Sequence, residues 1–146
     1  MVVDSCVDQE TKGPVALTYL AERGIPPEAV RLIVATHWHD DHVRGIAKVV
    51  QACPNAKFVC SQALLSEDFV TLVRAASSRS MMESTSGVDE LNDVIVSLIN
   101  RPKPKNTIGS GLELASANKR IWQREPDAEV WSLSPSAAEN EAAIKA

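Results

Sequence analysis

All three histidines of the chain lie between positions 37 and 42, directly after an apolar run. The run, Leu32 to Ala35, is continuous, as expected for a strand that is covered on both faces. It ends at Thr36, so the strand delivers imidazole and carboxylate groups to its C-terminal end. Ligand sites of α/β proteins gather at this end of the strands. The pattern therefore predicts a functional site at one edge of an α/β sheet.

The spacing within this cluster indicates metal binding. Residues two apart in an extended segment point to the same side, so His37 and His39 can reach one ion. Asp41 and His42 follow and can face a second ion nearby. Imidazole and carboxylate groups are natural ligands of zinc, and they also suit manganese or ferrous iron. The alternative is a polar loop in which Asp40 or Asp41 only caps the following helix; ligand-type residues at all these offsets favour a metal site.

The remaining pattern alternates strands and helices early and collects strands late. It predicts the α/β class, with a mixed β-sheet flanked by helices. Strands are expected at 2–3, 32–35, 57–60, 112–115, 121–122 and 130–133. Helices are expected at 14–23, with Val15, Tyr19 and Leu20 on one face, and at 43–50, 65–76, 88–99 and 136–144. Ser86 is expected to cap the helix at 88–99, and the serine-rich residues 77–86 to form a mobile loop.

Length and charge narrow the class of protein. A chain of 146 residues fits one domain, 1–146. The net charge of −4, with both signs mixed along the chain, argues against a nucleic-acid partner. The N-terminus has acids where a signal peptide has basic residues, and no apolar run is long enough to cross a bilayer. We therefore expect a cytoplasmic protein without a membrane partner.

Two or three of the cysteines are expected to be buried thiols in a reducing compartment. The cysteines are Cys6, Cys53 and Cys60. Cys60 follows an expected strand and could substitute for a metal ligand, although a core thiol is the favoured interpretation.

Residues 36–45, Thr-His-Trp-His-Asp-Asp-His-Val-Arg-Gly, resemble the T-H-x-H-x-D-H-x-x-G signature of metallo-β-lactamase-fold hydrolases. Val2 to Cys6 resembles the upstream strand whose aspartate supports the metal loop. The resemblance implies an αββα sandwich, in which His37 and His39 bind a first metal and Asp41 and His42 a second. It also implies that Asp4 and Thr36 orient these ligands through hydrogen bonds.

The activity implied by this resemblance is metal-dependent hydrolysis of a small-molecule substrate. One or two zinc ions would activate a water that attacks an ester, lactone, amide or phosphodiester. Asp41 would act as the catalytic residue that positions this water and handles its proton.

The family's site also needs ligands that this chain does not offer at matching positions. The family normally adds two further histidines and a bridging aspartate downstream, but no histidine follows His42. The later aspartates, none of them at the end of an expected buried strand, are Asp68, Asp89, Asp93 and Asp127. The chain therefore resembles the first half of the sandwich. A second hypothesis follows: a non-catalytic half-domain that binds metal weakly and forms a homo-oligomer through its uncovered apolar sheet face.

Overall fold

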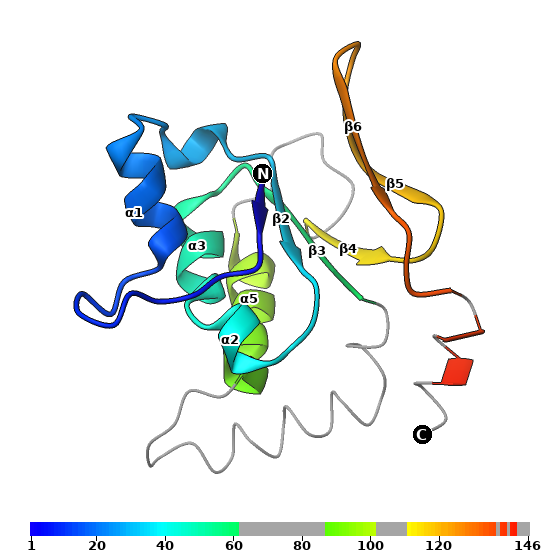
Figure 1. The fold of residues 1–146 in the computed structure, drawn as a ribbon, viewed down its shortest axis with the longest axis horizontal. Helices are drawn as coiled ribbons and strands as arrows, with labels where there is room; N and C mark the ends of the chain where they lie inside the picture. The colour runs from blue at the N-terminus through cyan, green and yellow to red at the C-terminus, as the bar shows by residue number, and fades with distance from the viewer. Residues whose placement is uncertain (62–86, 102–110, 137, 140, 143–146) are drawn as a thin grey trace.

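The computed structural model describes residues 1–61, 87–101, 111–136, 138–139 and 141–142 (Figure 1). The helix expected at 65–76, the loop expected at 77–86 and the cap expected at Ser86 lie outside the described residues. Parts of the helix expected at 136–144 lie outside them as well.

The described elements follow the expected order of strands and helices. The strands are β1 (Val2–Val3), β2 (Leu32–Ala35), β3 (Lys57–Ser61), β4 (Leu112–Ala115), β5 (Lys119–Arg124) and β6 (Ala128–Ser132). The helices are α1 (Val15–Glu22), the short 3-10 helix η1 (Pro27–Ala29), α2 (Asp40–Val43), α3 (Ile46–Ala52) and α5 (Gly87–Asn100). The α/β class is confirmed, and every expected strand is present.

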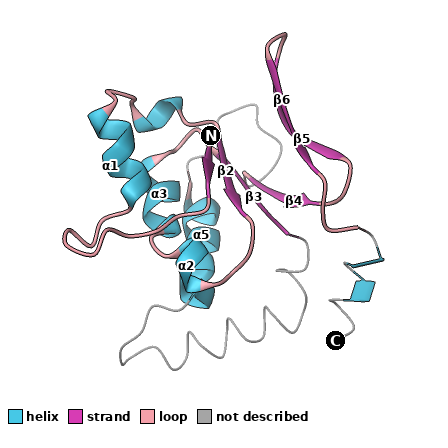
Figure 2. Cartoon of the chain, in the orientation of Figure 1, coloured by secondary structure: helices cyan, strands magenta, loops and turns pink. Residues whose placement is uncertain are grey.

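Parallel and antiparallel pairing both occur, but they are divided between two sheets. The larger sheet has the order β1-β2-β3-β4, and each neighbouring pair is parallel. β5 and β6 pair antiparallel in a separate hairpin. Figure 2 shows the helices on one side of the parallel sheet and the hairpin on the other. The described residues therefore supply a helical layer, a parallel sheet and a β-hairpin layer.

The parallel sheet is covered on both faces, which explains the continuous apolar run of β2. Ile33 and Ala35 pack in the larger core, between the sheet and the helices. Leu32 packs in the smaller core, on the opposite face, with Val59 and with Ile121 of the hairpin. Successive residues of a strand point to opposite faces, so a strand buried on both sides needs apolar residues throughout.

The face expected for α1 is wrong. Leu20 is buried, but Val15 is 41% exposed and Tyr19 is 52% exposed. Ala16 and Leu17 pack against the larger core in their place. Positions 16, 17 and 20 lie on one face of a helix with 3.6 residues per turn, so the buried stripe is rotated from the expected one.

The single helix expected at 43–50 is confirmed only from Ile46 onward, because the helix is interrupted at Gly45. α2 ends at Val43 and α3 begins at Ile46, and Gly45 between them has a φ of 81°. A Cβ atom at this position would lie 2.9 Å from Cγ1 of Val7. Both the left-handed backbone and the close packing therefore require glycine here.

Candidate metal centre

The candidate ligands lie at the C-terminal edge of the parallel sheet, in the loop that joins β2 to α2 (Figure 1). β1 runs parallel to β2, with Val3 opposite Val34. Both strands therefore end at the same edge, and this places Asp4, just after β1, beside Thr36, just after β2.

The candidate ligands converge. His37, His39 and Asp41 each offer a ligand atom, and these atoms lie within 4.8 Å of one another. The ring centroids of His37 and His42 are 3.7 Å apart, and Oδ2 of Asp41 lies 3.5 Å from Nε2 of His42. Asp41 is therefore close to His42 as well as to His37 and His39, so the four side chains lie in one region, but the group whose ligand atoms converge consists of His37, His39 and Asp41.

The donor set fits a divalent cation. It combines two imidazoles with a carboxylate, which suits zinc, manganese or ferrous iron. Two atoms bound to one zinc ion at about 2.1 Å can be at most about 4.2 Å apart, so the side chains, whose ligand atoms lie within 4.8 Å of one another, would move closer together to share one ion. His37 is half-buried, whereas His39 and Asp41 are exposed, so the cluster is open to solvent. Among the residues that the structure describes, no other three such side chains converge in this way.

Asp4 joins the loop to the end of β1 through its carboxylate. Oδ1 accepts a hydrogen bond of 2.8 Å from the backbone N–H of Thr36. Oδ2 accepts one of 2.7 Å from the Thr36 hydroxyl and lies 2.9 Å from Nδ1 of His42. These contacts hold the first residue of the loop and its last histidine at fixed positions relative to the sheet.

The same contacts determine which ring nitrogens can bind a metal. The Thr36 hydroxyl donates to Asp4, so it can only accept from Nδ1 of His37, which lies 3.0 Å away. Nδ1 of His42 donates to the Asp4 carboxylate. With Nδ1 protonated in His37 and His42, the lone pair of each ring is on Nε2. Hydrogen bonds of this kind orient metal-binding histidines and make them better ligands.

Asp4 is held in its charged form. Burial raises the pKa of its carboxyl group, but hydrogen bonds from the Thr36 backbone, from His42 and from the Thr36 hydroxyl outweigh this and bring the pKa below its ordinary value. The backbone of Asp4 is left-handed, with a φ of 58°, which aspartate tolerates better than most residues.

Helix α5 holds residues 36–42, here called the metal loop, from the side, through contacts that local sequence patterns do not predict. Oδ1 of Asp40 accepts a hydrogen bond from the backbone N–H of Gly87, the first residue of α5. In return, Glu90 of α5 accepts one of 2.7 Å from the N–H of Gly45 and one of 3.2 Å from that of Ala47. We call these three hydrogen bonds the α5 clasp. Asp40 therefore caps α5, which is distant in the sequence. It does not cap the helix at its own position, α2, as the alternative interpretation expected.

Gly87 allows this close approach. A Cβ atom there would lie only 1.8 Å from the carbonyl oxygen of Trp38, within the metal loop. Trp38 itself is 41% exposed. A glycine at the first position of α5 is thus the one signal in the sequence that marks the contact with the loop, and it acquires this meaning only once the fold is known.

The other residues considered as ligands lie elsewhere. Asp89 and Asp93 belong to α5, Asp127 lies in the turn of the hairpin, and Asp68 is outside the described residues. Cys60 is only 4% exposed and packs in the larger core, where burial raises its pKa to about 12. Its thiol therefore stays protonated near neutral pH, as the core interpretation predicts.

The comparisons with known proteins agree with this geometry. The model of the metallo-beta-lactamase superfamily matches residues 1–79, which is more than half of the chain, and the chain belongs to this family. Over 48 residues the chain is 50% identical to a hydroxyacylglutathione hydrolase of Edwardsiella ictaluri. That stretch covers 33% of this chain and only 18% of the length of that protein. No solved structure matches the chain significantly.

Within the described part of the chain, no helix has the length and apolar character needed to cross a membrane.

Proposed function

We propose that this chain is a zinc-dependent hydrolase, with manganese or ferrous iron as alternative cations. The observation that carries the proposal is the convergence of His37, His39 and Asp41 at the C-terminal edge of the sheet. The relative's name, hydroxyacylglutathione hydrolase, favours a small substrate with a cleavable acyl bond. Lactones, amides and phosphodiesters are the wider class of candidate substrates.

The residues of the site have distinct roles in this proposal. A divalent cation bound there would supply Lewis-acid chemistry, activating water and polarising the bond to be cleaved. His37 and His42 would contribute Nε2, because hydrogen bonds occupy Nδ1 in each ring. Asp41, whose side chain is 77% exposed, would orient the attacking water and accept its proton. Asp4 and Thr36 would act as positioning residues, since they contact the ligands and not the substrate.

Hydrolysis by the zinc-loaded chain tests the proposal. The substrates are 4-nitrophenyl acetate, as a generic ester, and a hydroxyacylglutathione. We expect Asp41→Asn to lower kcat about 100-fold or more, whereas Asp93→Asn, an exposed aspartate on α5, leaves it unchanged. A chain that binds zinc but hydrolyses neither substrate, or an Asp41→Asn variant as active as wild type, would overturn the proposal.

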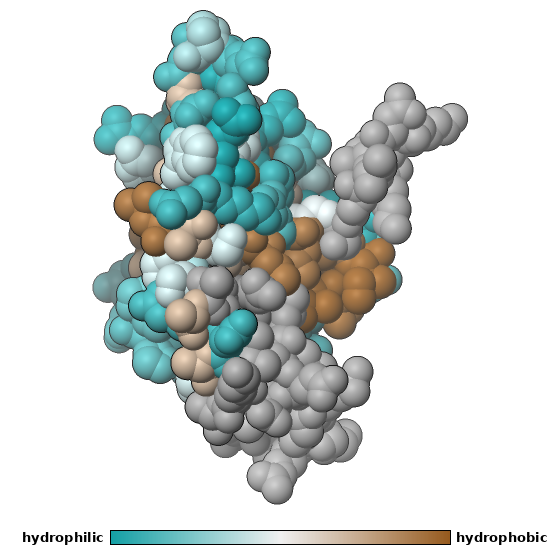
Figure 3. Space-filling model, turned by 90° about the vertical axis from the view of Figure 1, so that its right-hand side faces the viewer, coloured by the Kyte–Doolittle hydropathy of each residue, from teal (hydrophilic) through white to brown (hydrophobic). Residues whose placement is uncertain are grey.

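The alternative, a non-catalytic half-domain that self-associates, has one observation in its favour. On the side of the molecule that carries the hairpin, apolar residues gather near the middle of the surface (Figure 3). Trp131 is 49% exposed and Leu133 is 79% exposed. Exposed apolar surface favours association, so a homo-oligomer is proposed. The mass of wild type and of Leu133→Lys in solution, measured by light scattering, tests this proposal. A monomer mass for wild type would contradict it.

A further inference from the structure

A second candidate site lies at the other end of β2 from the metal loop. A pocket of about 710 Å³ opens there. Its lining includes Arg31 and Leu32, at the start of β2, and Trp122, Gln123 and Arg124, at the end of β5. The volume falls within the range of about 300–1,000 Å³ that is usual for small-molecule pockets.

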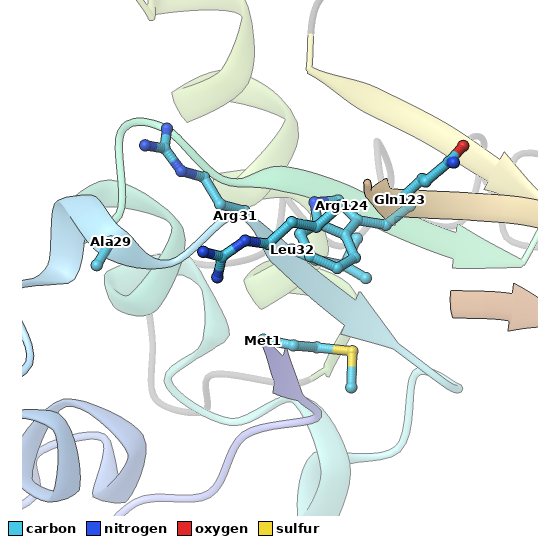
Figure 4. A pocket seen from close by; sticks show the side chains of 7 residues that line it. Met1, Ala29, Arg31, Leu32, Gln123 and Arg124 are labelled. Atoms are coloured by element: carbon cyan, nitrogen blue, oxygen red, sulfur yellow. The ribbon is translucent and has the colours of Figure 1, made fainter. Parts of the chain in front are cut away.

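The pocket is positively charged because of Arg31 and Arg124. Figure 4 shows both guanidinium groups extending from the pocket toward the side of Ala29. Within the described part of the chain, no carboxylate forms an ion pair with either group. By contrast, Arg44 pairs with Asp40, and Arg120 pairs with Glu129.

Arg31 and Arg124 thus bring two unpaired guanidinium groups to one pocket, in a chain whose net charge is −4. A guanidinium group carries five N–H donors in a planar fork, a geometry that suits phosphate and carboxylate oxygens. Two such groups on one pocket are therefore suited to recognising an anion.

The remaining walls are suited to an apolar ring. Trp122 lines the pocket and is half-buried, with its inner side packed against the smaller core, to which the buried Leu32 belongs. An indole presents a flat surface on which a planar group can stack, and the amide of Gln123 adds a further polar group. We propose that this pocket binds a small organic anion, namely a phosphate or phosphonate attached to a flat ring. The site is separate from the metal centre and does not depend on the proposed hydrolase activity.

The three tryptophans make the proposal testable by NMR, because each reports on a different part of the molecule. Trp38 lies in the metal loop, Trp122 lines the pocket, and Trp131 is exposed on β6. The probe is phenylphosphonate, titrated into metal-free protein while the indole N–H signals are followed. We expect the signal of Trp122, assigned through Trp122→Phe, to shift in a saturable way, while the signals of Trp38 and Trp131 stay in place.

Substitutions separate recognition by the two arginines from the effect of net charge. Arg31→Gln and Arg124→Gln should each weaken phenylphosphonate binding about tenfold. Both residues are exposed, so the fold should tolerate the changes. Lys48→Gln removes one charge from an exposed position on α3 and should leave the Kd unchanged. Methylphosphonate, which lacks the ring, should bind more weakly than phenylphosphonate.

Each other outcome overturns the proposal. A shift of Trp38 and not of Trp122 would place the anion at the metal loop. If Lys48→Gln weakened phenylphosphonate binding as much as the arginine variants do, the arginines would act only through the net charge of the protein. Unchanged affinity in both arginine variants, or no saturable shift at all, would remove the site.

Discussion

The carboxylate of Asp4 interacts with three groups of the metal loop, namely the backbone N–H and hydroxyl of Thr36 and Nδ1 of His42. Asp4→Asn keeps the shape of the side chain but removes its charge and one acceptor oxygen. Because loss of such an orienting contact typically costs a factor of about 10–100 in metal affinity, we expect a loss of this size. Competition with a chromophoric zinc chelator measures it.

The control for this substitution is Asp8→Asn. The Asp8 carboxylate accepts hydrogen bonds from the backbone N–H groups of Glu10 and Thr11, within its own loop. Asp8→Asn makes the same chemical change as Asp4→Asn, but at a position outside the metal site. Equal zinc affinities for the Asp4 and Asp8 variants would contradict the orienting role of Asp4.

Two glycines with left-handed backbone allow the packing at Gly45 to be measured. Gly45 has a φ of 81° and would place a Cβ atom 2.9 Å from Val7, whereas Gly24 has a φ of 63° and open space around it. Gly24→Ala should cost about 1–2 kcal/mol through backbone strain alone. Gly45→Ala should cost about 1–3 kcal/mol more, because the extra methyl group must displace its neighbours. Urea unfolding gives both free energies, and equal costs would show that packing at Gly45 is unimportant.

For individual residues, the sequence predicted the features that depend on spacing between neighbours in the chain. The cluster from His37 to His42 could be identified because its members are neighbours in the chain. The importance of Glu90 and Gly87 could not, because their partners lie more than forty residues away. A glutamate in the first turn of a helix is also common for electrostatic reasons that involve no partner.

Among the elements, α5 controls the start of α3 and the position of the metal loop through the α5 clasp. Glu90→Gln keeps the size of the side chain but replaces a charged acceptor with a neutral one. We expect it to lower the free energy of unfolding by about 1 kcal/mol and to weaken zinc binding as well, because the loop is then held less firmly. Asp93→Asn, an exposed position on the same helix, should change neither quantity. A Glu90→Gln variant that loses stability but keeps full zinc affinity would show that the α5 clasp stabilises the fold but does not contribute to metal binding.

An ionic cluster ties together three strands and makes stability depend on pH. Oε2 of Glu113, on β4, lies 2.6 Å from Nζ of Lys57 on β3, and its Oε1 lies 3.0 Å from Nζ of Lys119 on β5. Burial raises the pKa of Glu113, but the hydrogen bonds from Lys57 and Lys119 outweigh this and bring it below its ordinary value of 4.5.

The direction of the pH effect follows from this lowered pKa. A carboxyl group whose pKa is lower in the folded state stabilises the fold above its unfolded pKa, and that contribution is lost as the pH falls through the folded pKa. We expect wild type to lose this stability below about pH 4.5, and Glu113→Gln to show a flatter profile there. Urea unfolding between pH 7 and pH 3 measures it, with Glu22→Gln, an exposed glutamate on α1, as the control. Identical slopes for wild type and Glu113→Gln would contradict the expectation.

Element order was well predicted, because the apolar runs of β2 and β3 and the helical period of α5 are strong local signals. The break at Gly45 was missed because Val43, Ile46, Ala47 and Val50 keep helical spacing across it. The buried face of α1 was missed because both candidate stripes contain apolar residues, and only the position of the sheet decides between them.

For the whole molecule, the sequence predicted the α/β class but not how the strands are shared between sheets. Turn residues near Asn118 and Pro126 indicated the late strands. Nothing local, however, shows that β4 pairs in parallel with β3 while β5 and β6 form a hairpin over Leu32 and Val59. Pairing of that kind depends on contacts between residues far apart in the chain, so the two layers around the sheet became evident only from the structure.

We propose that one fold element, β2, delivers His37, His39 and Asp41 to a common cation site. Zinc titration of the metal-free chain by calorimetry tests it most directly, with circular dichroism to verify that the variants keep their fold. Wild type should take up about one zinc ion or more per chain in a saturable way, and the double variant His37→Ala, His39→Ala should lose this binding while remaining folded. Failure of folded wild type to bind zinc, or equal uptake by the double variant, would contradict the claim.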